Sequence, residues 1–532
     1  MIADALPVAD IAVLVVYLAG VVAFGCWFVR RSQGTEAFTV AGRSLPGWAV
    51  GLSIFGTYLS SNTFLGVPGK AYGTNWGQFV FSLSLPIAAI LAVRYFVPFY
   101  RRTGEVSAYH HLEKRFGAWA RTYAVVCYLL TQVSRVAAVM FGVSLALQAL
   151  TGWPLPAIIV ACGAGVTLYT LLGGIEAVIW TDVVQSIVLM VGAVVVAVML
   201  VIGMPEGPGQ IFRIAAPAGR FSLGSFAPDF GQATFWVVLA YGIVINLNNF
   251  GIDQSYIQRY HTARSDRDAA RSVWLGALMY VPISLLFFFI GSSLFAYYQT
   301  QPDLLGEVKA QVAGEQLADR RGEMSEAAFA EAVRARADEL DHVDVGDKVL
   351  PHFIVRRLPT GLAGLLIAAI VAAAMSSIDT SLNSSATITL EDLYKRYIHP
   401  GAGEAASMRV LHGATLVWGA VGTGVALAMI GVKSVLDAWW KMSGTFAGGM
   451  LGLFLLGLIA RRAKWHAALT GAVVGLAVIV WTTFSSRWLT GDLAWLKSPF
   501  HPFMTSVVGT LTILLVGLLI TAATRRARRN GE

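Results

Sequence analysis

A segment near residue 376 carries polar side chains within an otherwise apolar stretch. Ser376, Asp379, Thr380 and Asn383 follow the apolar run from Gly361 to Val371. Spacings of three, four and seven residues place hydroxyls, a carboxylate and an amide on one face of a helix. A carboxylate at bilayer depth costs roughly 2.5–3.5 kcal/mol, so it needs a compensating partner. Because hard oxygen ligands without Cys or His suit a hard cation such as sodium, this face predicts part of an ion path.

Composition places these side chains in a polytopic helical membrane protein. Hydrophobic residues make up 56% and charged residues 13% of the 532 residues, well below the ~25% charge of soluble domains. Repeated apolar runs near 20 residues predict an all-α fold with about 13 transmembrane helices. The predicted spans are 8–29, 47–68, 76–99, 119–150, 154–174, 178–203, 233–256, 269–297, 359–395, 407–431, 434–460, 465–486 and 500–523.

Basic clusters fall on alternate predicted loops. The positive-inside rule makes that side cytoplasmic, with the N-terminus outside and the C-terminus inside. The short loops and arginine-rich interior suit a bacterial inner (cell) membrane. The clusters are Arg30-Arg31, Arg94 through Arg121, Arg259 through Arg271, Lys395-Arg396, Arg461 through Lys464, and Arg525 through Arg529.

One long loop, residues 298–352, is expected outside the cell. It has twelve acidic and six basic residues, so the chain's net charge of +8 would be about +14 without it. The basic excess therefore belongs mostly to the cytoplasmic loops, and the lipid bilayer, not nucleic acid, is the expected partner. Within the loop, Met324 to Leu340 is predicted to form a short surface helix.

The second span is predicted to be a broken helix. Gly51, Gly56, Gly66 and Pro68 flank the largely polar run from Thr57 to Thr63. Irregular backbone at that depth is tolerated only where it is buried in protein or lines a cavity. The alternative interpretation is a glycine packing face whose hydroxyls bond back to their own helix.

Four local patterns, in order, resemble the sodium:solute symporter family, which includes glucose, proline, iodide and sialic acid carriers. They are "AGRSLPGW" (41–48), "GGIEAVIWTDVVQ" (173–185), "DQSYIQRY" (253–260) and "SSIDTSLNSSATITLEDLY" (376–394). The resemblance covers nearly the whole chain apart from the outer loop. It implies a LeuT-like core of two inverted five-helix repeats, with broken helices at the membrane midplane.

The resemblance also implies a division of the chain into segments. The first repeat and the second repeat form the transport core, and the outer loop is inserted in the second. Two further helices and a short basic tail follow the core. The expected segments are 1–46, 47–203, 204–232, 233–460 with the insertion 298–352, and 461–532.

A first sodium site is implied residue by residue. Gly56, Leu59 and Ala373 would supply backbone carbonyls, and Ser376 and Ser377 would supply hydroxyls. Five neutral oxygens suit a monovalent ion, so Na⁺ is expected as the coupling ion and no other cofactor is expected. The alternative is that the serines only ease a contact between helices.

A second sodium site is implied by Asp182, Ser376, Asp379 and Thr380. Relatives with this site tend to have a hydroxyl where this chain has Asp379. Two close carboxylates repel each other unless a cation lies between them. The additional acid could strengthen sodium binding, accept a proton, or pair with a basic residue.

Arg135 lies far from either end of the fourth span and matches an arginine that binds the substrate carboxylate in the sialic acid branch. A buried arginine requires an anionic partner, and its planar fork suits a carboxylate. The alternative is a salt bridge to Asp182 or Asp379.

Other polar residues match substrate-facing positions in the family. Asn246 and Asn249 share a helical face, and their amides suit hydroxylated substrates, although they could instead bridge helices. A glutamine that holds substrate in the sialic acid branch is not evident at Ser82, and Gln78 lies one turn earlier. The remaining predicted substrate residues are Ser60, Ser61 and Thr63.

Together these features predict a sodium-coupled symporter that imports a small hydrophilic solute by alternating access. A hydroxylated organic anion such as sialic acid is expected, ahead of a neutral sugar or a monocarboxylate. A transporter-like membrane sensor is the alternative of another class. An enzyme is not expected, because no nucleophile, acid pair or metal cluster converges, and no obligate protein partner is implied.

Overall fold

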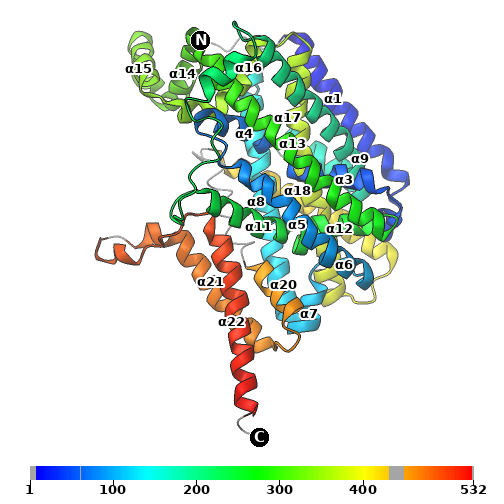
Figure 1. Ribbon diagram of the computed structural model, residues 1–532. Coiled ribbons are helices and arrows are strands. Elements are labelled where there is room, and N and C mark those ends of the chain that lie inside the picture. Colours follow the sequence, from blue (N-terminus) through cyan, green and yellow to red (C-terminus); the bar gives the residue numbers. More distant parts are fainter. Residues whose placement is uncertain (1–6, 60, 431–448, 490, 530–532) are drawn as a thin grey trace.

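The computed structural model describes residues 7–59, 61–430, 449–489 and 491–529, and within these ranges the chain is helical without named strands (Figure 1). The helices are α1 (Val8–Trp27), α2 (Thr35–Val40), α3 (Gly47–Tyr58), α4 (Ser61–Gly73), α5 (Phe79–Leu91), α6 (Val97–Thr103), α7 (His110–Phe116), α8 (Ala118–Thr151), α9 (Leu155–Ile202), α10 (Gly209–Ala215), α11 (Phe235–Ile252), α12 (Gln254–Thr262), α13 (Asp266–Gln299), α14 (Pro302–Gln316), α15 (Glu326–Glu339), α16 (His342–Arg357), α17 (Leu362–Ile388), α18 (Glu404–Ala428), α20 (Met450–Ile459), α21 (Trp465–Trp488) and α22 (Met504–Arg529).

The membrane-spanning character predicted from composition is confirmed. In the described part of the chain, ten helices are long and apolar enough to cross a membrane. Two predicted spans, 154–174 and 178–203, merge into α9, which changes direction at Gly174 with φ 56° and ψ −156°. Part of the predicted span 434–460 lies outside the described residues, so the count of thirteen stays a prediction.

The second span is broken, as its glycines and polar run predicted. α3 ends at Tyr58, and Leu59 has extended dihedrals (φ −90°, ψ 90°) before α4 begins at Ser61. The extended residue interrupts the helical hydrogen-bond ladder, so backbone carbonyls near Gly56 and Leu59 can face a ligand.

The seventh predicted span, 233–256, is present as α11 and is followed by a second break, which was not predicted from the sequence. α11 ends at Ile252, Asp253 is extended (φ −77°, ψ 119°), and its side chain accepts a hydrogen bond from the Ser255 amide at 2.8 Å. Tyrosine hydroxyls satisfy carbonyls freed by the break. Tyr100 donates to Gly251 O at 2.7 Å, and Tyr260 donates to Phe250 O at 2.9 Å.

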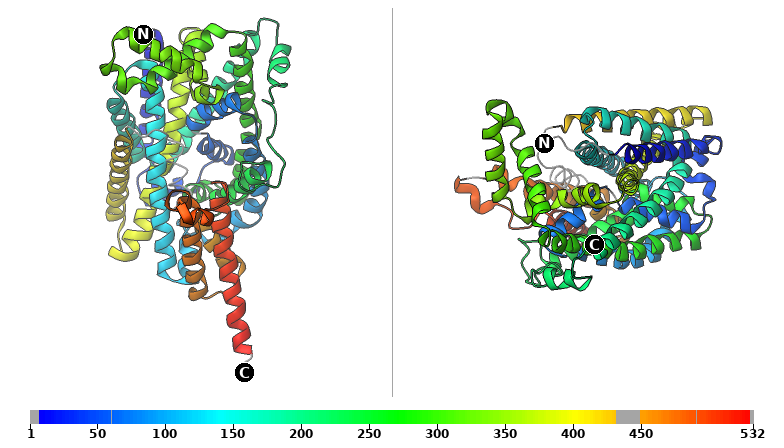
Figure 2. Two further views of the ribbon diagram at one scale, coloured as in Figure 1. Left: turned by 90° about the vertical axis from the view of Figure 1, so that its left-hand side faces the viewer. Right: turned by 90° about the horizontal axis from the view of Figure 1, so that it is seen from above.

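α17 occupies the centre of the bundle. Within its most apolar window 89% of the residues are buried, compared with 22% for the peripheral α1 (Figure 2). Asp10 of α1 holds the beginning of α17, because its Oδ1 accepts hydrogen bonds from the amides of Gly361 at 2.6 Å and Gly364 at 2.8 Å. A carboxylate at a helix N-terminus satisfies otherwise unpaired donors, so the polar helix has a fixed end.

The outer loop folds as a helical cap at the end of the molecule opposite the C-terminal end of α22 (Figures 1 and 2). The predicted helix within 324–340 is present as α15. α16 packs directly on α4, the second half of the broken span, through two glycines. A Cβ atom on Gly69 would lie 2.7 Å from Gly346 O, so only glycine allows this approach.

Candidate functional site: an ion and solute site between the broken helices

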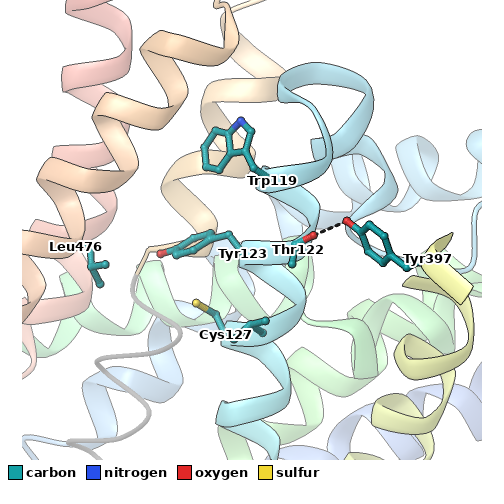
Figure 3. A pocket seen from close by; sticks show the side chains of 7 residues that line it. Trp119, Thr122, Tyr123, Cys127, Tyr397 and Leu476 are labelled. Carbon is teal, nitrogen blue, oxygen red and sulfur yellow. Dashed lines mark hydrogen bonds between the residues drawn. The ribbon is translucent and has the colours of Figure 1, made fainter. Parts of the chain in front are cut away.

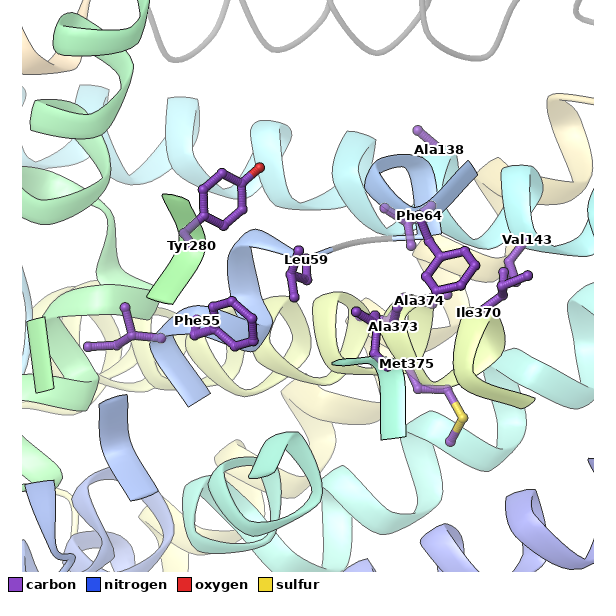
Figure 4. Packing of buried hydrophobic residues seen from close by; sticks show 14 of the residues in the cluster. Phe55, Leu59, Phe64, Ala138, Val143, Tyr280, Ile370, Ala373, Ala374 and Met375 are labelled. Atoms are coloured by element: carbon purple, nitrogen blue, oxygen red, sulfur yellow. The ribbon is translucent and has the colours of Figure 1, made fainter. Parts of the chain in front are cut away.

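The residues predicted for the first sodium site lie together where α3 ends beside α17. Figure 4 shows Leu59 at the end of α3 next to Ala373 of α17. A Cβ atom on Gly56 would lie 3.5 Å from Ser376 Oγ, and Ser376 and Ser377 are 2% and 3% exposed. The serines therefore face protein, not lipid, and Gly56 of α3 packs closely against Ser376 of α17.

Hydroxyls at this junction are incompletely paired. Ser376 Oγ is buried and interacts with the Asp182 side chain without a hydrogen bond of normal geometry within the described ranges, while Ser377 Oγ donates to Ala373 O at a long 3.4 Å. A buried hydroxyl without a partner is costly, so an unpaired oxygen that faces a second helix points to a ligand. A sodium ion suits this set of neutral oxygens.

The second predicted site already contains a cation, the guanidinium of Arg259. Arg259 is fully buried; its Nη2 donates to Asp182 Oδ2 at 2.9 Å and to Thr380 Oγ1 at 2.7 Å. The assignment of Arg259 to a basic cytoplasmic loop cluster is therefore wrong. The side chains of Asp182 and Ser376 interact with each other, but neither Asp182 Oδ1 nor Ser376 Oγ forms a hydrogen bond of normal geometry within the described part of the chain. A second sodium bound by Asp182, Ser376, Asp379 and Thr380 stays a prediction.

Asp379 is held by neutral donors. Tyr169 donates its hydroxyl to Asp379 Oδ2 at 2.5 Å, and the Thr380 amide donates to Oδ1 at 2.5 Å. Asp379 is 0% exposed and near enough to Asp182 for the two carboxylates to repel each other. Arg259 thus forms an ion pair with one of two neighbouring acids and also interacts electrostatically with Asp379, whose hydrogen bonds come from neutral donors.

Arg135 is the other basic group in this region. It is half-buried on α8 and interacts electrostatically with the hydroxyls of Tyr128 and Tyr256. It has no ion pair or hydrogen bond to any described residue. The alternative salt bridge is therefore not formed, since Asp182 pairs with Arg259 and Asp379 with Tyr169.

Two of the predicted substrate residues join helices in this structure. Asn246 is fully buried, and its Nδ2 donates to Ser84 Oγ at 2.9 Å, which links α11 to α5. Ser82 and Ser284 share a hydroxyl–hydroxyl hydrogen bond of 2.7 Å between α5 and α13. These contacts match the helix-bridging interpretation of Asn246, and they occupy the Ser82 hydroxyl.

The other predicted substrate residues lie nearer the break. Thr63 Oγ1 donates to Tyr58 O at 3.3 Å, and Asn249, half-buried on α11, interacts with the Tyr58 hydroxyl. Gln78 precedes α5 and is half-buried. Ser60 lies outside the described residues, and the Ser61 side chain is not described.

Aromatic rings form one wall near these groups. The Tyr58 ring lies 5.3 Å from that of Tyr256, 5.4 Å from Tyr280 and 6.0 Å from Phe250, so the wall draws on α3, α12, α13 and α11. Tyrosines present apolar faces together with hydroxyls that form hydrogen bonds. Beside Arg135, such a wall suits a solute with both carbon faces and hydroxyls.

A surface groove lies away from these residues. It measures about 620 Å³ and runs between α8, the helical turn at Thr389–Ile398 and α21 (Figure 3). A 2.7 Å hydrogen bond joins the hydroxyls of Thr122 and Tyr397 at its edge. Its lining is apolar and aromatic and contains none of the predicted site residues, so the groove does not identify the solute site.

Three polar residues that complete the site were not identified from the sequence. Ser53 Oγ donates to Asp182 Oδ2 at 2.5 Å and accepts from Arg259 Nε at 2.7 Å. Tyr169 satisfies Asp379, as described above. The partners of these pairs are far apart along the chain, so no local spacing indicates them. For Arg259, the neighbouring "QSYIQRY" run offered a signal, because it places a charge among aromatic residues.

The close approach at Gly56 leads to a prediction. A Cβ there would lie 2.6 Å from Ser186 Oγ and 3.5 Å from Ser376 Oγ, so Gly56→Ala should separate α3 from α9 and α17. The half-saturating sodium concentration is expected to rise by about tenfold, the factor for ~1.4 kcal/mol. The half-saturating sodium concentration is measured from the sodium-dependent thermal stabilisation of the purified protein. Gly66→Ala is the matched control, since a Cβ there meets nothing within 4 Å; equal sodium affinity in both variants would contradict the predicted site.

The fold and the site define a sodium-coupled membrane transporter of LeuT-like architecture. The model of the sodium:solute symporter family matches residues 38–318 and 324–475, and the chain belongs to this family.

Similar proteins of this kind are known. The chain is 31% identical over 513 residues to the sodium/sialic acid symporter NanT of Aliivibrio fischeri, covering 95% of this chain and 91% of that protein. It is 32% identical over 512 residues to the sodium/sialic acid symporter SiaT of Proteus mirabilis, covering 96% and 94%. A solved substrate-bound outward-open Na⁺-coupled sialic acid symporter superimposes with a TM-score of 0.83 at 30% identity, covering 97% of each chain.

Proposed function

We propose that this protein imports a hydroxylated organic anion, sialic acid or a close analogue, together with sodium. The unpaired guanidinium of Arg135 is the observation on which the substrate class depends. Asp182 binds Arg259 and Asp379 accepts a hydrogen bond from Tyr169, and no described carboxylate forms an ion pair with Arg135, so its positive charge has no paired counter-ion among the described residues. An anionic solute supplies that counter-ion, and a carboxylate fits the planar fork bidentately.

The remaining chemistry near Arg135 suits hydroxyl groups on the same solute. Asn249 and Thr63 lie beside the Tyr58 break and offer an amide and a hydroxyl, and Tyr256 and Tyr280 offer aromatic faces. Buried polar groups of this kind reject solutes that leave them unpaired. A monocarboxylate would satisfy Arg135 alone, and a neutral sugar would leave it unsatisfied.

Coupling follows from where the sodium ligands lie. A sodium ion between Gly56 and Leu59 of α3 and Ser376 and Ser377 of α17 would hold the break of α3 against the central helix. The solute would bind beside it near Arg135. Since both ligands favour the same arrangement of helices, each raises the affinity for the other.

The sodium stoichiometry depends on solute charge. One charge moved through 100 mV yields ~2.3 kcal/mol, and a tenfold sodium gradient adds ~1.4 kcal/mol. Together they could accumulate a neutral solute roughly 500-fold. A monovalent anion carried with one sodium loses the electrical contribution, so an anionic substrate favours a second sodium. The Asp182 carboxylate and the Ser376 hydroxyl, which interact with each other, support that second site as neighbouring oxygen ligands.

We place the chain in a bacterial inner membrane with its N-terminus outside and its C-terminus in the cytoplasm. The proposed repeats are 47–203 and 233–460, and the breaks at Leu59 and Asp253 support them because each repeat then contains one broken helix. Transport requires neither an enzymatic step nor an obligate protein partner.

A thermal-shift titration tests the substrate class. Purified protein in sodium buffer is titrated with N-acetylneuraminic acid, pyruvate and glucose, and each titration is repeated in potassium. We expect stabilisation by the sialic acid in sodium and a much smaller shift in potassium. A sodium-dependent shift with glucose or pyruvate but none with the sialic acid would replace the proposed substrate and leave sodium coupling intact.

A further inference from the structure

A groove runs between α1 and α9, which lie side by side at the edge of the bundle (Figure 1). It has a volume of about 310 Å³, and the side chains that line it are apolar. Residues four apart share one face of a helix, and each helix presents such a face to the groove. We call this cavity the α1–α9 groove; its walls are formed by Leu14, Leu18 and Val22 of α1 and by Ala157, Ala161 and Gly165 of α9.

Contacts at both ends of the α1–α9 groove hold α1 in place, so the space between them is part of the fold. Near the beginning of α1, a Cβ atom on Gly364 of α17 would collide with Asp10 O, because the two helices touch there. Near the end of α1, a Cβ atom on Gly25 would lie 2.9 Å from the Tyr169 side chain of α9. Between these contacts, the small residues of α9 leave the space unfilled.

The α1–α9 groove faces lipid and extends to the middle of the membrane. Trp153, in the loop between α8 and α9, lines one end and is 39% exposed, and Ala157 and Ala161 are exposed as well. Tryptophan is enriched at membrane interfaces. From Leu155 to Gly165, α9 rises about 15 Å, which is half of the ~30 Å hydrocarbon core. The groove therefore runs through one leaflet, the outer one in the proposed orientation.

The central helix α17 forms the base of the α1–α9 groove. Val371 and Met375 line this base and are 1% and 5% exposed. Met375 directly precedes Ser376, which is predicted to bind sodium. Because closely packed interiors transmit small displacements, packing against Met375 acts on the part of α17 that carries the predicted sodium ligands.

The dimensions of the α1–α9 groove suit a single alkyl chain. A volume of 310 Å³ along ~15 Å of helix gives a mean cross-section of about 20 Å². A helix with a diameter of ~10 Å needs about 80 Å², so a second protein helix does not fit. Water is disfavoured, because a cavity with apolar walls stays dry. The surrounding lipid supplies alkyl chains at this depth.

We propose that the α1–α9 groove binds one acyl chain of a membrane phospholipid, and that the bound chain holds Met375 and stabilises the sodium-binding arrangement of α17. The effect on sodium rests on the proposed function, whereas the lipid site depends on the groove alone. The chain supplies van der Waals contacts that the walls of an empty cavity lack. A helix that is already held loses less conformational entropy when sodium binds, so lipid and sodium each raise the affinity for the other.

Photo-crosslinking tests the lipid site. The protein is reconstituted into vesicles of phosphatidylethanolamine and phosphatidylglycerol that contain a phosphatidylcholine with a diazirine near the end of one acyl chain. After illumination, adducts are mapped by peptide mass spectrometry. We expect adducts on Val371 or Met375, which are too buried for a chain outside the groove to contact. Ala161→Phe places a ring in the groove and should lower the yield of these adducts by about tenfold, the factor for ~1.4 kcal/mol of overpacking.

Ala164→Phe is the matched control, because Ala164 is exposed on the same helix and lies outside the groove lining. It should leave the adduct yield unchanged. Ala157→Phe, one turn nearer the loop, is a second variant with the same expected loss as Ala161→Phe. If the parent protein gives no adducts on Val371 or Met375, or if the groove variants give the same yield as the control, the lipid site is overturned.

The link to sodium is measured on delipidated protein. Adding back unlabelled phospholipid should lower the half-saturating sodium concentration for thermal stabilisation by about fivefold, the low end for coupling between two sites. Ala161→Phe should not respond to lipid, because its ring already fills the groove, whereas Ala164→Phe should respond as the parent does. A parent protein whose sodium response ignores lipid would refute the link and leave the lipid site. If sodium does not stabilise the parent although the adducts form, the proposed function fails instead.

Discussion

Arg135→Ala is expected to reduce uptake of the anionic solute by about 30- to 1,000-fold. Truncating one partner of a buried, hydrogen-bonded charge pair costs roughly 2–4 kcal/mol, much of it from the anion left without a partner. No described residue depends on Arg135 for an ion pair or hydrogen bond, so folding should be nearly unaffected. Radiolabelled uptake into proteoliposomes measures the loss, and the thermal unfolding temperature without solute checks the fold.

Arg135→Lys separates charge from geometry. Lysine keeps the positive charge but cannot form two parallel hydrogen bonds to a carboxylate, so partial uptake is expected, with most of the loss in apparent affinity. Wild-type uptake in Arg135→Ala would refute the role of Arg135 in solute binding. If Arg135→Ala takes up a neutral solute but not the anion, this result would support a role of Arg135 in solute binding.

Ser376→Ala is expected to raise the half-saturating sodium concentration by about 10- to 100-fold. Among the described residues the buried Ser376 hydroxyl interacts only with the Asp182 carboxylate and without normal hydrogen-bond geometry, so sodium is its expected partner, and a hydrogen-bond-like contact to a charge contributes roughly 1.5–3 kcal/mol. Without sodium, the variant should be as stable as the parent or more so, because an unsatisfied buried group is removed. Unfolding temperatures with and without sodium measure both effects.

Ser385→Ala is the matched control on α17. Ser385 is 2% exposed and nine residues after Ser376, which places it on the opposite helix face. The Ser385→Ala substitution should leave the sodium-dependent thermal stabilisation unchanged. A loss of stability of Ser376→Ala in sodium-free buffer, with its sodium response retained, would show that the hydroxyl is structural and not a ligand.

The sequence predicted those parts of the fold that depend on local composition. Apolar runs near bilayer length located the spanning helices, and glycines beside a polar run located the break at Leu59. The break at Asp253 was missed because Asn246 and Asn249 were interpreted as substrate-facing positions on one helix, although asparagines and Gly251 directly precede Asp253. Asp253 caps α12, and an acidic residue at that position was the local signal for a new helix start.

The sequence predicted only those parts of the candidate site that lie on a single helix. The face of α17 around Ser376 follows from helical spacing, and Arg135 is noticeable as a charge within an apolar span. The pairing of Asp182 with Arg259 crosses 77 residues of sequence and depends on tertiary packing. Charge bias on loops describes orientation in the membrane, not burial, so it placed Arg259 with the cytoplasmic arginines although the side chain lies inside the protein.

Solute flux into proteoliposomes under imposed ion gradients tests sodium coupling most directly. Vesicles loaded with potassium are diluted into sodium or choline medium containing radiolabelled N-acetylneuraminic acid, at a clamped membrane potential. We expect accumulation above the external concentration in sodium, its collapse when an ionophore dissipates the sodium gradient, and none in choline. Equal uptake in sodium and choline would contradict the coupling of transport to an ion held between α3 and α17.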